Sequence, residues 1–169
     1  MKLLAALALL ALSAACAPTS QAPAAVVAPS PFPPDSGAVF AGDKARELVG
    51  QCSRISPGPV EGVWTPSQAD IDALEPVLFA LLAEKLRTAG VAAAPGTYLR
   101  QYGGLIIGGR RIIYVNGFSH GLFDQRPDPP PLDWHTNAEQ VCDGGPIVFG
   151  VEYDPATHSF GHFAFNGAI

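Results

Sequence analysis

Residues 98–118 read YLRQYGGLIIGGRRIIYVNGF, and this stretch decides the fold of the chain. Two largely apolar runs, 98–107 and 110–118, flank the pair Gly108-Gly109. Two glycines between such runs predict a tight β-hairpin turn, because both turn positions favour a positive φ. Apolar residues occupy both faces of this hairpin, whereas a hairpin with one solvated face alternates apolar with polar residues. The sequence therefore predicts a hairpin that is covered on both sides.

A second glycine pair lies inside the first run of this hairpin. The turn fixes which residues lie opposite each other: Ile107 and Arg110, Leu105 and Ile112, Gly103 and Tyr114. Paired glycines in a strand mark a bend or a place where another group approaches the backbone. We favour a bend. The alternative is a shallow binding surface formed by Tyr102, Gly103, Gly104 and Trp134.

The segment before the hairpin predicts the main helix. Thr65 can cap its start, with Gln68 three residues later as in a capping box, and Gly90 can end it. Pro76 interrupts the helix and predicts a kink or break there, because proline lacks the backbone donor. Apolar residues recur at three- and four-residue steps: Ile71, Leu74, Leu78, Leu81 or Leu82, and Leu86.

Two further strands, 146–153 and 160–165, end the chain and are joined by a turn at 154–157. One main helix followed by a four-stranded antiparallel sheet predicts the α+β class. This order of elements resembles cystatin-like folds, and that resemblance implies a helix packed across a curved sheet. A short helix is also expected over 43–51.

The segment 119–141 is unusually long for a loop in a compact domain. It includes Leu122, Phe123, Leu132 and Trp134, which can cover one face of the sheet. We therefore expect a packed cover, with a recognition loop as the alternative.

The N-terminus has the features of an export signal. Lys2 precedes ten Leu and Ala residues, and small residues then lead to Cys16. Ten apolar residues are too few to span a bilayer, which takes about 20. The sequence therefore predicts a signal peptide at 1–15, a Pro/Ala-rich tether at 16–42 and a single domain at 43–169.

A cysteine directly after small residues resembles the lipobox of bacterial lipoproteins. The resemblance implies acylation of Cys16 and a membrane partner through this lipid anchor. It also implies the outer membrane in a Gram-negative cell, because Ala17 rather than Asp follows the cysteine. Ser13 stands where the family usually has Leu, so ordinary signal-peptidase cleavage, after Ala15 or Ala17, is the alternative. The product would then be periplasmic or secreted.

Residues 98–118 and 151–167 resemble segments of small exported bacterial proteins whose role is uncharacterised. This second resemblance implies no activity.

The other two cysteines, Cys52 and Cys142, form an even pair. In an oxidising compartment they predict a disulfide, and closing a loop of about 90 residues is worth about 4–5 kcal/mol in the chain-entropy model. Two buried free thiols are the alternative. A metal site is not expected, because the usual CxxC spacing is missing.

The run Gly117-Phe118-Ser119-His120-Gly121 matches the GxSxG pattern of serine hydrolases, and Asp154 and His158 follow in the required order. A nucleophile elbow needs a helix directly after the serine and a mainly parallel sheet. Here a proline-rich segment and a hairpin are predicted instead. Catalysis by Ser119 is therefore only an alternative hypothesis.

No motif predicts a metal or cofactor site. The four histidines are His120, His135, His158 and His162, and we expect them to be solvated. No phosphate loop, dinucleotide pattern or redox CxxC pair occurs in the sequence. The net charge is −5, or −6 once Lys2 is removed with the signal, and there is no basic run that would bind nucleic acid.

The sequence thus favours a non-enzymatic envelope lipoprotein whose tethered domain binds a protein or another envelope component. A small secreted serine hydrolase and a purely structural envelope protein are the alternatives.

Overall fold

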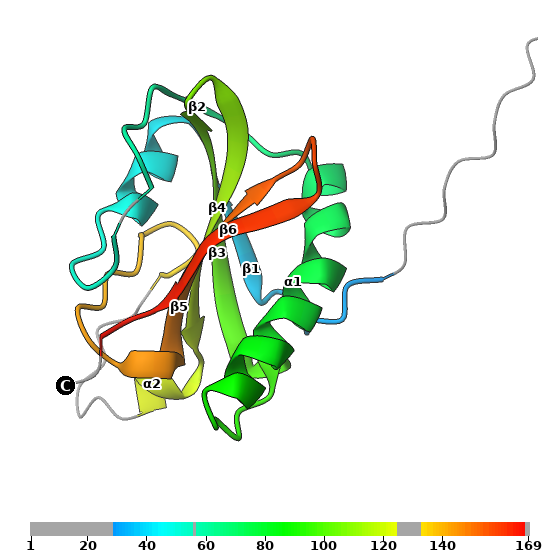
Figure 1. Ribbon diagram of the computed structural model, residues 1–169, viewed down its shortest axis with the longest axis vertical. Coiled ribbons are helices and arrows are strands. Elements are labelled where there is room, and N and C mark those ends of the chain that lie inside the picture. Colours follow the sequence, from blue (N-terminus) through cyan, green and yellow to red (C-terminus); the bar gives the residue numbers. More distant parts are fainter. Residues whose placement is uncertain (1–28, 56, 125–132, 168–169) are drawn as a thin grey trace, which may run out of the picture.

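The structure is a computed structural model of the 169-residue chain, and it describes residues 29–55, 57–124 and 133–167 (Figure 1). Its elements follow the chain in the order β1 (Gly37–Phe40), 3-10 helix η1 (Gly42–Val49), β2 (Gly62–Trp64), α1 (Gln68–Thr88), η2 (Pro95–Thr97), β3 (Tyr98–Ile107), β4 (Arg110–Ser119), α2 (Gly121–Asp124), η3 (Gly145–Ile147), β5 (Val148–Asp154) and β6 (Ser159–Phe165). The predicted signal peptide and Cys16 lie outside the described residues.

The predicted α+β class is confirmed. One main helix, α1, lies against one face of a mostly antiparallel sheet, and η1 lies on the other side (Figure 1). The described residues form six strands rather than the predicted four. Five of them follow the order β1-β3-β4-β5-β6, and β2 also pairs with β3.

The predicted hairpin is β3 and β4, joined at Gly108-Gly109, whose φ angles are 57° and 70°. Its register is the predicted one, with Leu105 opposite Ile112 and Gly103 opposite Tyr114. The glycine pair therefore determines both the turn and the pairing of the two central strands.

The two strands that the sequence did not predict share the outer edge of β3. β1 runs parallel to residues 100–103, and β2 runs antiparallel to residues 104–106. Strands of four and three residues are too short for a periodic pattern to appear, and β1 follows directly after a proline-rich stretch. The fold also begins before residue 43, because Phe32 and Phe40 are buried in its core.

The main helix begins later than predicted and runs unbroken through Pro76. Ser67 is its N-cap and forms a capping box with Asp70, in place of the predicted pair Thr65 and Gln68. The predicted break is absent because the apolar stripe around Pro76 is buried against the sheet, which compensates for one lost backbone hydrogen bond. Every residue of that stripe is buried: Ile71, Leu74, Leu78, Leu82 and Leu86.

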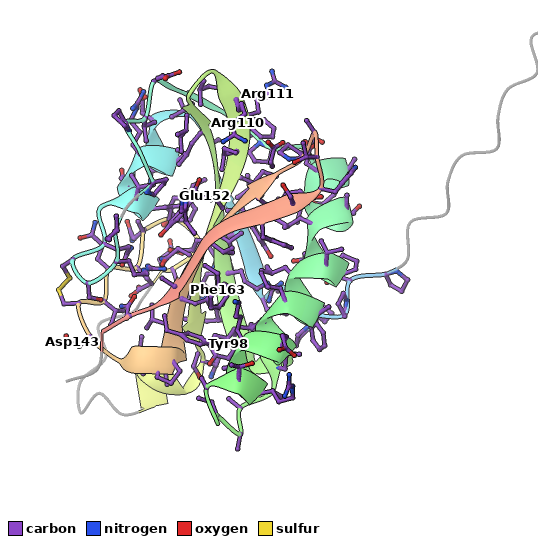
Figure 2. The ribbon with its side chains drawn as sticks, in the orientation of Figure 1. Tyr98, Arg110, Arg111, Asp143, Glu152 and Phe163 are labelled. Atoms are coloured by element: carbon purple, nitrogen blue, oxygen red, sulfur yellow. A yellow bond between two sulfur atoms is a disulfide. The ribbon has the colours of Figure 1, made fainter. Side chains whose placement is uncertain are left out.

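Side chains fill the space on both sides of the sheet, as the apolar hairpin required (Figure 2). The side facing α1 holds one core cluster, which includes Tyr102 and Val115. On the opposite side, Ala45 and Leu48 of η1 pack with Leu105. The chain thus covers both faces of the hairpin itself.

The described part of the long loop also packs as a cover. The Trp134 ring lies 6.1 Å from the Phe118 ring, in an edge-on arrangement. Gln101 Nε2 donates to the carbonyl oxygens of Trp134 and Asn137, at 2.6 and 2.8 Å. Leu122 packs in the same small cluster, whereas Leu132 lies outside the described residues.

The last strand contains an irregularity that separates two kinds of side chain. The pairing of β5 with β6 shifts between Gly150 and Glu152, and His162 has a positive φ of 51°. His162 contacts Glu152 through Nδ1, while Phe163 stacks on Phe149 in the core facing α1. The bulge therefore keeps aromatic rings in the core and turns an imidazole to the other side.

In the part of the chain that the structure describes, no helix combines the length and the apolar character needed to cross a membrane.

Candidate functional site

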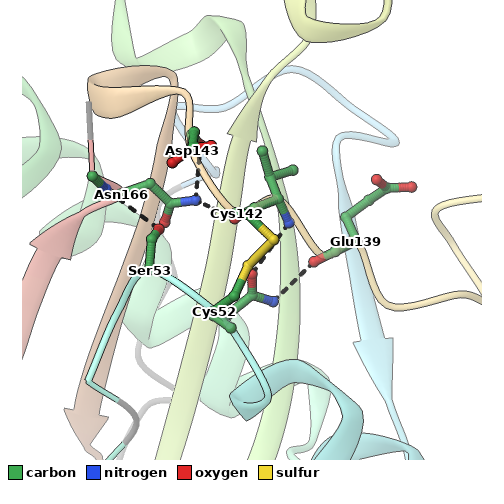
Figure 3. Close-up of a disulfide and its surroundings, with 9 residues drawn as sticks. Cys52, Ser53, Glu139, Cys142, Asp143 and Asn166 are labelled. Carbon is green, nitrogen blue, oxygen red and sulfur yellow. Dashed lines mark hydrogen bonds between the residues drawn. A yellow bond between two sulfur atoms is a disulfide. The ribbon is translucent and has the colours of Figure 1, made fainter. Parts of the chain in front are cut away.

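The predicted disulfide joins Cys52 to Cys142, with their Cα atoms 5.0 Å apart (Figure 3). Neighbouring hydrogen bonds strengthen this junction. Gln51 Nε2 donates to the Glu139 carbonyl at 2.9 Å, and the Gly167 amide donates to Ser53 Oγ at 3.3 Å. The segment that follows Cys52 is therefore held beside the C-terminal strand.

This junction positions Arg54 against the sheet face opposite α1. Its Nη2 donates to Asn116 Oδ1 at 2.6 Å, and only 7% of the residue is exposed. Gly150 of β5 makes room for it: a Cβ there would lie 2.2 Å from Arg54 Nη1 and 2.4 Å from the Tyr114 hydroxyl. A side chain at position 150 would displace the guanidinium.

The Arg54 guanidinium has few partners for a buried charge. Among the described residues, Nε and Nη1 are buried and have no hydrogen-bond acceptor, and no carboxylate forms an ion pair with Arg54. Burial lowers the pKa of Arg54, and the nearby Tyr114 raises it by less. An arginine keeps its charge in proteins, so this site carries a positive charge that the described residues do not neutralise.

Arg54 borders a pocket of about 610 Å³ that lies between β6 and the described residues 53–55 and 57–58. This volume lies within the range of small-molecule sites. Ile55, at 97% exposure, and Pro57 contribute apolar surface to one side, and His162 lies at the β6 side. The pocket therefore combines apolar walls with a buried cation.

A row of polar side chains crosses the sheet beside this pocket and consists of Arg54, Tyr114, Glu152 and His162. Burial raises the pKa of Tyr114, the Arg54 charge lowers it and the charge of Glu152 raises it again. The side chain of Glu152 is only 8% exposed and contacts the imidazole of His162, which is 73% exposed. Arg54 and His162 thus line two sides of the pocket, and both are residue types whose N–H groups can hold an anion. In the structure Nε and Nη1 of Arg54 are buried, and His162 Nδ1 contacts Glu152.

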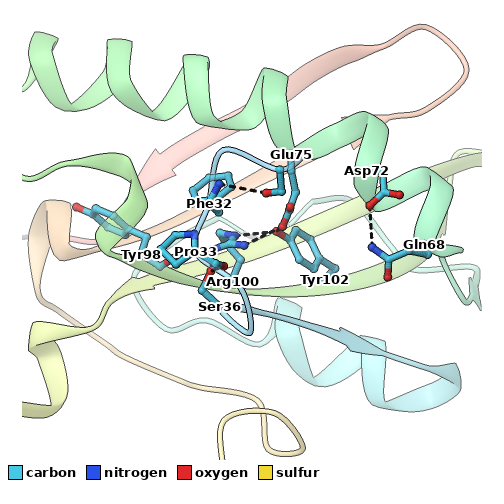
Figure 4. A network of polar contacts seen from close by, with 10 residues as sticks. Phe32, Pro33, Ser36, Gln68, Asp72, Glu75, Tyr98, Arg100 and Tyr102 are labelled. Carbon is cyan, nitrogen blue, oxygen red and sulfur yellow. Dashed lines mark hydrogen bonds and ion pairs between the residues drawn. The ribbon is translucent and has the colours of Figure 1, made fainter. Parts of the chain in front are cut away.

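A second buried arginine, Arg100, lies on the face that packs against α1 (Figure 4). All three of its guanidinium nitrogens have partners: Glu75 at 2.8 Å, the Tyr102 hydroxyl at 2.8 Å, Ser36 Oγ at 2.7 Å and the Tyr98 carbonyl at 2.9 Å. Its guanidinium carbon also lies 3.7 Å from the centre of the Phe32 ring. This network attaches the N-terminal segment to the core.

The ionisation of Glu75 follows from the same contacts. Burial raises the pKa of Glu75. Hydrogen bonds from Ser30, Arg100 and Tyr102, together with the Arg100 charge, lower the pKa by more than burial raises it, so the net shift is downward. Tyr102 donates to Glu75 at 2.7 Å, and burial raises the pKa of this tyrosine. Glu75 is therefore charged and the Tyr102 phenol is neutral at pH 7.

The four residues considered as a binding surface do not form one. Tyr102 is buried in the Arg100 network, whereas Trp134 lies half-buried on the opposite side of the sheet. A Cβ at Gly103 would lie 2.9 Å from Leu48 Cδ1, and one at Gly104 would lie 2.3 Å from the Trp64 carbonyl oxygen. The glycine pair therefore admits η1 and β2 of the same chain.

The residues of the serine hydrolase triad considered as an alternative lie far apart. Ser119 ends β4 beside Tyr98, and the preceding residue of β4 pairs with Val148 at the start of β5. Asp154 lies six residues further along β5, about 20 Å away at the spacing of a β-strand. His158 Nδ1 lies 2.8 Å from the Tyr153 hydroxyl, next to Asp154 and not to Ser119.

The histidines do not gather into a metal site either. Within residues 29–55, 57–124 and 133–167, no group of three or more His, Cys, Asp or Glu residues could hold a metal ion. His158 and His162 have separate partners, Tyr153 and Glu152. His135 lies 3.9 Å from Asp133, and both side chains are more than half exposed.

Sequence reasoning missed Arg54. It is a lone arginine two residues after Cys52, so no spacing pattern singles it out. The combination of a predicted disulfide and a charged residue two positions after one of its cysteines was the available signal, because a disulfide restricts where that side chain can go.

Comparison of the chain with known protein families, with curated proteins and with solved structures finds no match in any of the three. The function must therefore be argued from the chain's own geometry.

Proposed function

We propose that this protein is a non-enzymatic cell-envelope lipoprotein whose folded domain binds a protein or another envelope component. The pocket that lies between β6 and residues 53–55 and 57–58 is the proposed binding site. The observation that carries the proposal is the buried guanidinium of Arg54, which borders a pocket of ligand size and has no acceptor for Nε or Nη1 among the described residues.

The proposed location rests on the N-terminal sequence together with the disulfide. Disulfides such as Cys52–Cys142 persist mainly in oxidising compartments. The lipobox-like residues before Cys16 supply the proposed anchor, which would lie in the outer membrane of a Gram-negative cell. Cleavage without acylation would give a periplasmic or secreted form of the same binding domain.

The two alternatives make different demands on the site. A serine hydrolase needs a histidine next to Ser119, and His158 lies at the other end of β5. A purely structural envelope protein needs no occupant for the Arg54 pocket. The charge of Arg54, which no described residue neutralises, favours the binding domain over this structural alternative.

The cystatin-like architecture is likewise a proposal. It is supported by α1 lying across one face of strands that are mostly antiparallel. The short strands β1 and β2 are additions to the four-stranded arrangement expected from the sequence.

The anchor is tested by intact mass of the protein from the membrane fraction, with and without Cys16→Ser. We expect a mass that carries acyl chains and loses them in the variant. A soluble product of unmodified mass, starting near Cys16, would contradict the lipid anchor.

Binding at the pocket is tested by placing a photo-reactive amino acid at Ile55 in cells. Position 77 is the matched control, because Val77 is 42% exposed on α1, away from the pocket. We expect covalent adducts from position 55 and none from position 77. Equal adducts from both positions, or none from either, would overturn the assignment of the pocket.

A further inference from the structure

We infer that the Arg54 pocket binds a small organic carboxylate with an apolar body, whose carboxylate accepts hydrogen bonds from Arg54. This inference rests on the proposed function, because it names the ligand class of the same pocket.

Arg54 has an incomplete set of partners among the described residues. A buried charge is costly unless it is paired and its donors are satisfied. Asn116 accepts from Nη2, but Nε and Nη1 have no acceptor among the described residues. A ligand carboxylate supplies both the missing acceptor atoms and the missing negative charge.

Part of the remaining pocket surface is apolar. Ile55 is almost fully exposed, and Pro57 and Ala164 also line the pocket. Exposed apolar surface beside a buried cation matches a ligand that has an anionic end and an apolar body. A hydrated inorganic anion would leave these walls in contact with water.

The negative charge around the pocket favours a ligand that carries a single negative charge. Glu152 lies between Tyr114 and His162 along the polar row, and the whole chain carries a net charge of −5. A phosphate dianion would be repelled by Glu152 more strongly than a monovalent carboxylate. His162 already contacts Glu152, so it offers a carboxylate only part of its donor capacity.

The route to the guanidinium involves the segment formed by residues 53–55 and 57–58. Arg54 lines the pocket, yet Nε and Nη1 are themselves buried. The described residues of this segment have no helix or strand structure, although the disulfide holds its start. Binding of a carboxylate to both nitrogens therefore requires Arg54 and its described neighbours, Ser53 and Ile55, to shift away from the sheet.

The test uses the full chain carrying Cys16→Ser, which lacks the proposed acylation site and needs no detergent. Straight-chain carboxylates from acetate to decanoate are titrated by calorimetry, with the matching neutral amides and inorganic phosphate as comparison ligands. We expect affinity to rise with chain length and to be at least tenfold higher for a carboxylate than for its amide.

Two variants connect this binding to Arg54. Arg54→Met removes the charge at similar length and should abolish the preference for carboxylate over amide. Arg87→Met is the matched control, because Arg87 is an exposed arginine on α1 paired with Glu84, and it should bind as the parent chain does. Arg54→Lys keeps the charge and should retain a weaker preference, which provides a second reading if Arg54→Met fails to fold.

Equal binding of carboxylate and amide, unchanged binding by Arg54→Met, or binding of phosphate alone would each overturn the inference. The absence of any binding would also overturn it. Adducts from position 55 would in that case still support the proposed binding function, so the two failures are distinguishable.

Discussion

The two buried arginines of this domain lie on opposite faces of one sheet and differ in how their charge is balanced. Arg100, on the face that packs against α1, has a carboxylate, two hydroxyls and a carbonyl around its guanidinium. Arg54, on the other face, has Asn116 alone among the described residues. Both residues are more than nine-tenths buried, so burial alone does not explain the difference.

The difference separates a structural role from a binding role. At Arg100 the chain itself neutralises the charge, and the contact holds the segment around Phe32 in place. At Arg54 the charge is desolvated and no described carboxylate pairs with it, which lowers stability unless something else supplies the anion. Because the same sheet surrounds Arg100 with hydrogen-bond partners and a carboxylate, the smaller set of described partners at Arg54 is a specific feature of that site and not a general property of the fold.

The largest predicted effect concerns the attachment of the Arg54 segment. Replacing both Cys52 and Cys142 with serine frees the start of this segment, and the loop-entropy model gives a loss of about 4–5 kcal/mol. Urea unfolding of the double variant against the oxidised parent chain measures this loss. An unchanged midpoint would show that the hydrogen bonds around Ser53 and Glu139 suffice to hold the segment.

The next largest effect is expected from Glu75→Gln. It leaves the Arg100 guanidinium buried without its counter-charge, and Tyr102 and Ser36 can compensate only in part. We expect a loss of about 3 kcal/mol in the free energy of unfolding. Glu84→Gln is the control, because the exposed pair of Glu84 and Arg87 should leave the urea midpoint unchanged. Equal effects of the two substitutions would contradict the structural role assigned to Arg100.

The loss of stability in acid gives a second test of the ion pair between Glu75 and Arg100. The pKa of Glu75 is lower in the folded chain than in the unfolded one, so its charge stabilises the fold above the unfolded pKa of about 4.3. This contribution is lost as pH falls through the folded pKa. Between about pH 5 and pH 3 the parent chain should therefore lose more stability than Glu75→Gln. Parallel curves from urea unfolding at each pH would contradict this assignment.

The smallest effect is expected from Arg54→Met in the absence of ligand. The substitution removes an uncompensated buried charge, which stabilises the fold, and it leaves Asn116 Oδ1 without its donor, which costs about 1–3 kcal/mol. We expect the two changes to offset, so that the free energy of unfolding stays equal or rises. A loss as large as that of Glu75→Gln would mean that Arg54 is a structural arginine after all.

The central part of the fold could be predicted from the sequence because its signals are local. Gly108-Gly109 determines the turn, and the register of ten pairs along β3 and β4 follows from it. The apolar stripe of α1 is visible in the same way. Its start was misplaced by two residues because Thr65 and Ser67 both begin a plausible capping sequence, and only Ser67 has the acidic partner, Asp70, that closes the box.

The outer parts of the fold, and the candidate site, depend on contacts that no local pattern contains. η1 and β2 can pack against β3 because Gly103 and Gly104 allow Leu48 and Trp64 to approach the backbone, and the sequence shows only that something can approach there. Arg54 becomes notable only when Gly150, which is distant in sequence, makes room for its guanidinium. Pairing over such separations is a property of the tertiary structure.

The way the sheet ends on each side has a consequence for self-association in a crowded compartment. One edge is divided between β1 and β2, which run in opposite directions over four and three residues. The other edge, β6, is interrupted by the bulge at His162. Neither edge offers a long, regular ladder to which another copy of the chain could add a strand. The sheet thus resists edge-to-edge aggregation by its geometry, without needing a layer of charged side chains.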